Sequence, residues 1–352
     1  MATYTLNYKL KKPAESDFYS VKDFNDNADT IDAKLKLGVD AKTLVDSLNT
    51  NMTSAQKDLD MLVQRSVIIV EVWAPPNTQV TLEQGALSFS GTVGSSMKLL
   101  APVSTLGTWE MSYTYANKTY FKDIRVDNLG YNRVLAPPSL AASPWDYIAM
   151  VSEAGLAREA YVLGDTKSLT SSMGTYDVQI IGFDHDFYSV PKPGRERAGI
   201  TFQMKTPTGA NYIMDSDTRF VQEWEYVNMR TDQLPLIFDS LPVELQDAIK
   251  MVRKYTSLYN RTLGSVTTDD LFLFSDYELL GYKSVYSDYP FAQQYEYYRC
   301  GHTPYKNTPY WLRNNVPGVN GLERFLVISN DSQSPKQVDC NNPQGLCLGF
   351  CV

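Results

Sequence analysis

Several features that would point to common protein classes are scarce or absent in this chain of 352 residues. The net charge is −8 and the Lys and Arg residues form no basic cluster, which argues against nucleic acid and anionic membranes as partners. No apolar run approaches the length of a membrane span. The N-terminus, Met1-Ala2-Thr3-Tyr4, lacks the charged and apolar regions of a signal peptide. We therefore expect synthesis in a cytoplasm, no membrane insertion and no export by a signal peptide.

Histidine is also scarce, and this limits the enzyme chemistry that the chain can perform. His185 and His302 are the only two, so a general base would be one of these or a carboxylate. His185 stands between Asp184 and Asp186, which suits a metal ligand or an oriented base, but a hydrogen-bonded polar turn at a strand end is the favoured interpretation. A glycosidase needs two carboxylates that face one sugar bond, and the sequence alone does not show which of the 40 acidic residues would pair. We predict no enzymatic activity, no cofactor and no metal site.

The four cysteines lie near the end of the sequence, at Cys300, Cys340, Cys347 and Cys351. The spacing around Cys300-Gly301-His302 matches no common zinc pattern. Disulfides are expected if the protein functions outside a cell, whereas buried free thiols are the alternative. The sequence does not decide between them.

Tyrosine is abundant, with 24 copies in an aromatic content of 12%. Tyrosine has a high strand propensity, which accounts for most of these residues. It is also enriched on surfaces that contact ligands or partners, because its ring is apolar and its hydroxyl is polar. Most of these tyrosines are therefore expected in strands, and some of them at a surface that binds a ligand or partner.

Residues 21–66 carry a heptad pattern. Apolar residues recur at alternating steps of three and four, and after a weak patch at Gly38 and Lys42 we take the pattern to continue in one unbroken frame. A lone helix would leave this narrow apolar seam in water, so we predict a parallel coiled coil between copies of the chain. The seam residues mix β-branched and other types, which leaves dimer and trimer open. The predicted seam consists of Val21, Phe24, Ala28, Ile31, Leu35, Val45, Leu48, Met52, Leu59 and Leu62.

Residues 1–20 are extended in character and continue into a distinctive helix start. Tyr8-Lys9-Leu10-Lys11-Lys12-Pro13, Asp17-Phe18-Tyr19 and the run 23–32 together resemble the N-terminal attachment segment of bacteriophage tail and baseplate proteins. An ordinary amphipathic helix start, capped by Ser16 or Asp17, is the alternative. The resemblance implies a homotrimer that is anchored to a virion tail and assembled in a bacterial cytoplasm. The implied attachment residues are Tyr8, Leu10, Pro13, Phe18 and Tyr19.

Residues 67–127 predict a small all-β module. A strand at 67–73 ends at Pro75-Pro76, and alternating apolar and polar residues at 109–115 predict a strand with one buried face. The module resembles the short immunoglobulin-like sandwiches of phage fibres, which implies a spacer. Residues 128–146 are rich in proline and small residues, which predicts a linker.

Residues 147–352 mix helix and strand patterns. Ser240 is the predicted cap of a helix over 240–256 whose buried stripe is Leu245, Ile249 and Val252. Several blocks resemble, in order, a family of uncharacterised domains of phage and bacterial surface proteins that has a C-type-lectin-like fold of the formylglycine-generating-enzyme kind. That resemblance implies an α+β domain used in receptor binding. The blocks are 148–155, 164–167, 180–186, 240–256, 271–278, 294–298, 310–313 and 345–352.

The chain departs from that family in ways that affect ligand choice. Asn314 and Asn315 follow Trp311-Leu312-Arg313, where the family has Ser-Pro, and the calcium-binding lectin signatures are absent. The resemblance therefore implies no particular ligand. Aromatic, amide and guanidinium side chains near the C-terminus are typical of surfaces that bind sugars or protein loops. The predicted receptor contacts are Tyr305, Asn307, Asn314, Asn315, Asn330, Asp331 and Gln333.

These patterns predict a multidomain protein with a trimeric parallel coiled coil, an immunoglobulin-like β-sandwich and an α+β C-type-lectin-like domain at 147–352. The predicted function is that of a phage tail-fibre or receptor-binding protein, located in the virion tail. It would bind tail or baseplate proteins through its N-terminus and a host-surface glycan or protein through its C-terminal domain. A structural baseplate or decoration subunit and a glycan-degrading tail enzyme are the alternatives.

Overall fold

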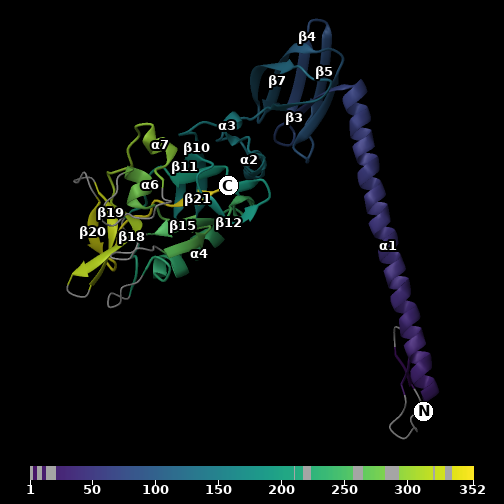
Figure 1. Ribbon diagram of the computed structural model, residues 1–352. Helices are drawn as coiled ribbons and strands as arrows, with labels where there is room; N and C mark the ends of the chain where they lie inside the picture. The colour runs from purple at the N-terminus through teal and green to yellow at the C-terminus, as the bar shows by residue number, and fades with distance from the viewer. Residues whose placement is uncertain are drawn as a thin grey trace. The chain divides into compact units, whose positions relative to one another are not determined.

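The computed structural model of the chain is shown in Figure 1. Backbone contacts divide the chain into two units, of which the first comprises residues 1–69, 103–106 and 127–132 and the second comprises 70–102, 107–126 and 133–352. The structure describes residues 3–5, 10–12, 21–209, 211–216, 223–256, 265–281, 293–319, 322–329 and 335–352.

The first unit is dominated by one long helix, α1 (Val21–Ser66), of 46 residues. Its span matches the predicted helix. Lys22–Asp26 and Lys42–Asp46 pair across one turn at 2.7 Å, which suits a solvated helix surface. Two short strands precede it, β1 (Thr3–Tyr4) and β2 (Lys11–Lys12), which pair antiparallel. Within the described residues, no helix has both the length and the apolar content needed to cross a membrane.

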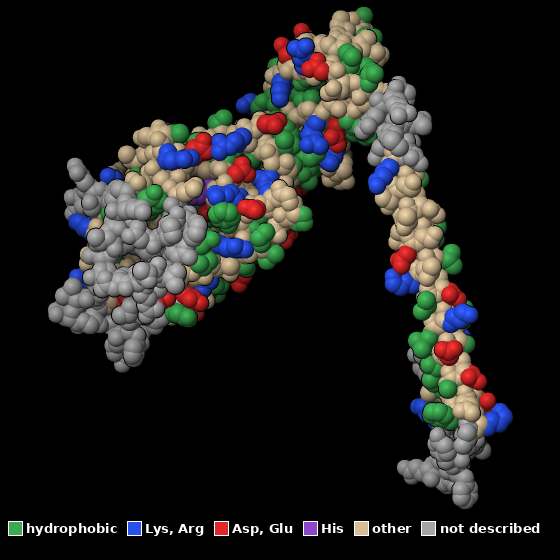
Figure 2. Space-filling view, in the orientation of Figure 1, with side chains coloured by type: hydrophobic (Ala, Val, Ile, Leu, Met, Phe, Trp, Pro, Cys, Tyr) green, Lys and Arg blue, Asp and Glu red, His purple; other side chains and the backbone are tan. Residues whose placement is uncertain are grey.

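The apolar seam of α1 is exposed in the single chain. Phe24 is 60% exposed, Leu35 is 64% exposed and Met52 is 71% exposed. Hydrophobic side chains lie along the helix among charged ones in Figure 2. Ala28, Ile31, Val45 and Leu48 are exposed as well, whereas the side chains of Val21, Leu59 and Leu62 lie outside the described part of the helix. The exposed seam is the surface that a coiled-coil partner would cover.

The heptad frame of α1 is interrupted, and the expectation of one unbroken frame is wrong. The steps to their neighbours (35 to 38 and 45 to 48) place Leu35 and Val45 at the same heptad position, yet they lie ten positions apart, which is one heptad plus three residues. Such a three-residue insertion is a stammer, which overwinds a coiled coil locally. Three further apolar residues are exposed between residues 35 and 45, at Leu37, Val39 and Leu44. The seam is therefore two heptad blocks that meet between residues 35 and 45.

A group of β-strands follows α1. One sheet has the strand order β6-β3-β9 and the other has the order β5-β4-β7-β8. In β7, Trp109 and Met111 are buried while Glu110 is exposed, as the alternating sequence predicts. The strands are β3 (Ile68–Trp73), β4 (Gln79–Gln84), β5 (Leu87–Thr92), β6 (Lys98–Val103), β7 (Gly107–Tyr115), β8 (Lys118–Val126) and β9 (Gly130–Leu135). Because β9 occupies part of 128–146, that segment is only partly a linker.

The remainder of the chain builds three further sheets. Their strand orders are β10-β11-β14-β21-β17, β13-β12-β15-β16 and β18-β19-β20. The first is antiparallel throughout. The strands are β10 (Thr166–Ser171), β11 (Gly174–Phe183), β12 (Phe187–Lys192), β13 (Arg195–Arg197), β14 (Ile200–Met204), β15 (Val252–Thr256), β16 (Ser265–Asp269), β17 (Leu271–Phe272), β18 (Tyr310–Val319), β19 (Leu322–Ile328), β20 (Lys336–Asp339) and β21 (Gly349–Cys351).

The helices of this part are short. Among the residues that the structure describes, the longest after α1 is α2, with nine residues. The helices are α2 (Trp145–Glu153), α3 (Ala157–Ala160), the π-helix η1 (Met229–Gln233), α4 (Leu234–Asp239), α5 (Val243–Ala248), α6 (Asp276–Leu280) and α7 (Glu296–Arg299). The predicted fold class, with an α+β C-type-lectin-like C-terminal domain, is therefore wrong: beyond α1 the chain is predominantly β-sheet.

The predicted helix over 240–256 shows why the class was wrong. The helix is only α5, with Pro242 as its N-cap, and Ser240 is instead the C-cap of α4. The backbone becomes extended at Ile249, and β15 begins at Val252. Within β15 the buried residues alternate, which is the period of a strand rather than of a helix. Val252 would be a buried position in either a helix or a strand. The sequence prediction assigned it to a helix, whereas the segment is a strand.

The core of this part is organised around β21, which lies between β14 and β17. Phe350 stacks on Phe202 with ring centroids 5.2 Å apart and meets the edge of Trp145 at 5.9 Å. A side chain at Gly349 would collide with the rings of Phe272 and Phe274, so only glycine fits there. The last strand of the sequence is thus a central element of the sheet.

Candidate functional site

A network of four buried charges lies inside the C-terminal part of the chain. Nζ of Lys254 is 2.8 Å from Oδ1 of Asp186 and 2.9 Å from Oε1 of Glu278. Arg313 donates two hydrogen bonds to the Glu278 carboxylate, one of them at 2.8 Å. All four residues are buried, with 0% to 5% of their surface exposed. The two positive and two negative charges balance, as buried charges require.

Separate elements supply these charges. Lys254 comes from β15, and Arg313 comes from β18. Glu278 lies in α6, where it forms a capping box with Ser275 and accepts a hydrogen bond from the Ser275 amide at 2.9 Å. Asp186 lies just before β12, beyond the end of β11. The network therefore links a turn, two strands and a short helix that are distant in the sequence.

The Asp186 carboxylate accepts several further hydrogen bonds. Donors are the Tyr295 hydroxyl at 2.9 Å, the Thr201 hydroxyl at 2.7 Å and the Cys351 thiol at 3.3 Å. Burial alone raises the pKa of Asp186, but the charge of Lys254 and the hydrogen bonds from Lys254 and Thr201 outweigh it and hold the pKa well below its usual range. The carboxylate is therefore ionised at neutral pH.

Glu278 is ionised for a similar reason. Burial raises its pKa, but Arg313 and Lys254 outweigh that effect and lower the pKa to about 2. A general acid needs a carboxyl that keeps its proton near neutral pH, and neither Glu278 nor Asp186 meets that requirement. The network can organise the fold and a neighbouring surface, and it is poorly suited to acid catalysis.

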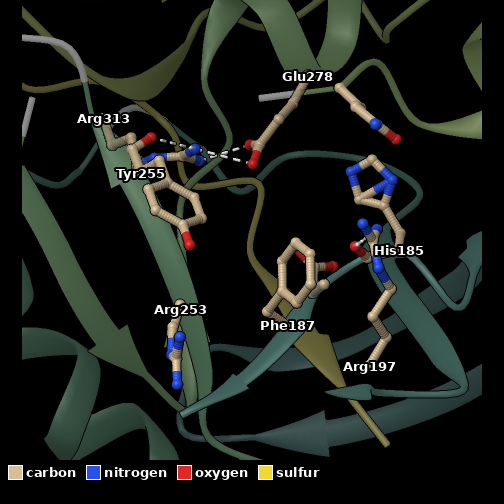
Figure 3. Close-up of a pocket in the computed structure, with 9 residues that line it drawn as sticks. His185, Phe187, Arg197, Arg253, Tyr255, Glu278 and Arg313 are labelled. Atoms are coloured by element: carbon tan, nitrogen blue, oxygen red, sulfur yellow. Dashed lines mark hydrogen bonds and ion pairs between the residues drawn. The ribbon is translucent and has the colours of Figure 1, made fainter. Parts of the chain in front are cut away.

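A small cavity lies beside the network (Figure 3). Its volume of about 20 Å³ is enough for one water molecule. Nε of Arg313, which is fully buried, has no hydrogen-bond partner among the described residues, and it belongs to a side chain that borders this cavity. The cavity is lined by His185, Asp186, Phe187, Arg197, Arg253, Tyr255, Glu278, Gln293 and Arg313.

His185 lies two residues after the end of β11, close to the strand end at which the sequence places it. Its ring centroid is 4.0 Å from that of Tyr295, and its carbonyl accepts a hydrogen bond from Nη1 of Arg197 at 2.6 Å. Burial lowers the pKa of His185, and the neighbouring Asp186 only partly opposes this effect. The imidazole is therefore uncharged at neutral pH.

Two half-buried arginines stand at the rim of the cavity. The Arg197 guanidinium lies 3.9 Å from the centre of the Phe187 ring, and Arg253 donates to the Ser189 carbonyl at 3.1 Å. In the part of the chain that the structure describes, no carboxylate forms an ion pair with Arg197 or Arg253. Tyr255 completes the aromatic lining.

The predicted receptor contacts include surface residues, buried residues and residues outside the described part of the chain. Tyr305 is half-buried and Asn307 is exposed, both in the segment between α7 and β18. Asn314 and Asn315 are not in a loop: they lie in β18, 1% and 4% exposed, and Asn314 accepts a hydrogen bond from the Asp276 amide at 2.8 Å. Their prediction as surface contacts is wrong, because β18 turns both side chains into the domain interior. Asn330, Asp331 and Gln333 lie outside the described residues.

The predicted attachment residues lie mostly outside the described part of the chain. Leu10 is half-buried, and its amide donates to the Thr5 hydroxyl at 2.9 Å. Tyr8, Pro13, Phe18 and Tyr19 are not among the described residues.

The cysteines and the remaining histidine form no shared site. All four cysteines are free thiols, with Cys300 exposed and the other three buried. His302 stacks on Tyr297 with ring centroids 3.9 Å apart. Across the described ranges, His, Cys, Asp and Glu side chains form no group of three that would hold a metal ion.

Sequence reasoning did not identify the charge network. Two signals were available: Lys254 occupies an inward position in the alternation of β15, and Arg313 directly follows the buried pair Trp311 and Leu312. A charge at an inward position predicts a buried partner. No such signal distinguishes Asp186 or Glu278 from the other acidic residues.

No protein-family model, no curated protein and no solved structure matches this chain.

Proposed function

We propose that this chain is a bacteriophage tail-fibre or receptor-binding protein that acts as a homotrimer. In this proposal α1 joins the copies, the N-terminal segment attaches to tail or baseplate proteins, and the C-terminal part contacts a host surface glycan or protein. The protein would then be part of the virion tail, assembled in the bacterial cytoplasm. The β-rich architecture of the C-terminal part takes the place of the lectin-like fold that was expected.

The exposed seam of α1 is the observation that carries the proposal. Phe24, Leu35 and Met52 expose most of their surface in one chain. Full burial of such a side chain contributes about 1.5–3 kcal/mol, so several of them provide a strong drive to associate. A helix of 46 residues with this pattern is far longer than the others in the chain and suits a stalk better than a globular core.

The buried charge network of the C-terminal part supplies no general acid for cleavage. Asp186 and Glu278 are held ionised by Lys254 and Arg313, which removes them as proton donors. A binding protein that is displayed in three copies gains effective affinity of about two to four orders of magnitude through avidity. A weak site on each copy is then sufficient for attachment to a cell.

The self-association is tested by sedimentation of the full chain and two variants. We expect the wild type to sediment as a trimer and Leu48→Asp, which places a charge in the seam, to sediment as monomers at the same concentration. Ser47→Asp adds the same charge next to the seam and is the matched control, because Ser47 is exposed and outside the predicted seam. A wild type that sediments as a monomer would remove the basis of the proposal.

Host recognition is tested separately with labelled full-length protein on a panel of bacterial cells. Wild-type protein and Ser47→Asp should bind susceptible cells, whereas monomeric Leu48→Asp should bind them weakly. Equal binding by trimer and monomer would contradict the role of multiple copies.

A further inference from the structure

We propose that the rim of the cavity in Figure 3 binds an acidic sugar through Arg197 and Arg253, which lie on either side of Phe187. This inference rests on the proposed function and names the class of ligand that the C-terminal part recognises. It is independent of the stalk, because all of its residues lie within residues 185–313.

The charges around the cavity leave a local positive surplus. The four charges of the network balance, and His185 is uncharged at neutral pH because burial lowers its pKa. Arg197 and Arg253 remain, without a carboxylate partner in the described residues. The whole chain has a net charge of −8, so a local positive surplus is not what its composition alone would give.

Other arginines of the same part show that ion pairing is common here. Each of four forms an ion pair with a carboxylate at 2.6 or 2.7 Å. The pairs are Arg158–Glu296, Arg195–Asp184, Arg230–Asp269 and Arg324–Asp339. Arg197 and Arg253 differ because they contact backbone carbonyls instead. A carbonyl orients a guanidinium but leaves its charge available for an external anion.

The unused donors of both arginines belong to side chains that line the cavity. Arg197 donates through Nη1 to the His185 carbonyl, which leaves Nε and Nη2. Arg253 donates through Nε and Nη2 to the Ser189 carbonyl, which leaves Nη1. Guanidinium groups held in this way bind carboxylates with strong, charge-assisted hydrogen bonds.

The size and lining of the cavity select the kind of anion. About 20 Å³ admits a water molecule or one small group, so a sugar ring must stay outside the enclosed space. Phe187 and Tyr255 border the same opening in Figure 3, and aromatic rings pack against the C–H faces of sugars. A carboxylate attached to a sugar ring satisfies both features, whereas a neutral sugar leaves the arginines without an anion.

The test is a titration of the full-length protein with D-glucuronate, D-glucose, acetate and inorganic phosphate, followed by calorimetry. We expect D-glucuronate to bind more tightly than the other three, because only it offers both the carboxylate and the ring. Arg197→Gln and Arg253→Gln should each weaken D-glucuronate binding by about tenfold or more. Arg253→Lys keeps the charge but not the planar fork, so its affinity should be intermediate.

Arg299→Gln is the matched control, because Arg299 is exposed at the end of α7 and does not line the cavity. It should bind D-glucuronate as the wild type does, and circular dichroism should show that every variant is folded. D-glucose binding as tightly as D-glucuronate, tighter binding of phosphate, unchanged binding by the glutamine variants, or no binding of D-glucuronate in the millimolar range would each overturn the inference. If the trimer still attached to cells in that case, only the ligand class would be wrong and the proposed function would stand.

Discussion

Replacing Lys254 with methionine tests whether the buried charge network stabilises the fold. Lys254 is 1% exposed and contacts Asp186 and Glu278 at 2.8 and 2.9 Å. Methionine has a similar length but no charge, so Lys254→Met leaves two buried carboxylates facing a single cation, Arg313. Removing one partner of a buried ion pair costs about 3–5 kcal/mol. We expect a loss of that size in the free energy of unfolding.

Urea unfolding measures this change, followed by the fluorescence of the buried residues Trp224 and Trp311. Lys205→Met, at an exposed lysine, is the matched control and should change the free energy of unfolding by less than about 0.5 kcal/mol. The double variant Lys254→Met with Asp186→Asn restores charge balance, because Glu278 and Arg313 still pair. It should recover part of the loss, with a coupling energy of about 0.5–3 kcal/mol.

Two results would refute the reasoning about the network. One is a Lys254→Met variant that unfolds within about 1 kcal/mol of the wild type, since that is far below the cost of an unpaired buried charge. The other is additivity in the double variant, since independent effects would mean that Lys254 and Asp186 do not interact.

Three other predictions concern pH, the thiols and the packing of β21. The pKa of Glu278 is lowered from 4.5 to about 2, so its contribution to stability should be full above pH 4.5 and be lost as the pH decreases toward 2. A urea midpoint that stays constant from pH 5 to pH 3 would contradict this expectation. An aromatic disulfide reagent should label Cys300 alone in the folded protein and all four cysteines in urea. The other three thiols are buried, and burial raises the pKa of Cys347 to about 12. Rapid labelling of a second thiol in the native state would disprove this assignment. Gly349→Ala should cost about 1–3 kcal/mol, because the new methyl group meets the rings of Phe272 and Phe274, and an unchanged melting temperature would show that these rings can move.

Some features of this protein were determined locally and were therefore visible in the sequence. The helical span of 21–66 follows from apolar spacing over many turns, and β7 follows from strict alternation around Trp109 and Met111. These patterns repeat often enough to identify the helix and the strand, although the heptad frame of the helix shifts once. The position of His185 after a strand was likewise predicted, because the strand at 174–183 has a clear pattern of its own.

Other features depended on contacts between distant residues. Val252 fits a helical stripe and a strand alternation equally well, and only pairing with β12 and β16 made the segment a strand. The sequence predicts a loop at Asn314 and Asn315. In the structure both lie in β18, which pairs with β19, and both are buried. A short polar sequence has no period that reveals which neighbour will cover it.

The sequence alone determined where the long helix runs, and it also contains the stammer between residues 35 and 45, since both depend only on the spacing of side chains along one chain. Tertiary structure decided which charges meet. Lys254 finds Asp186 across 68 residues, and Arg313 finds Glu278 across 35. A buried charge is stable only when a specific partner lies within hydrogen-bonding distance, and that distance is set by the packing of sheets rather than by position in the sequence.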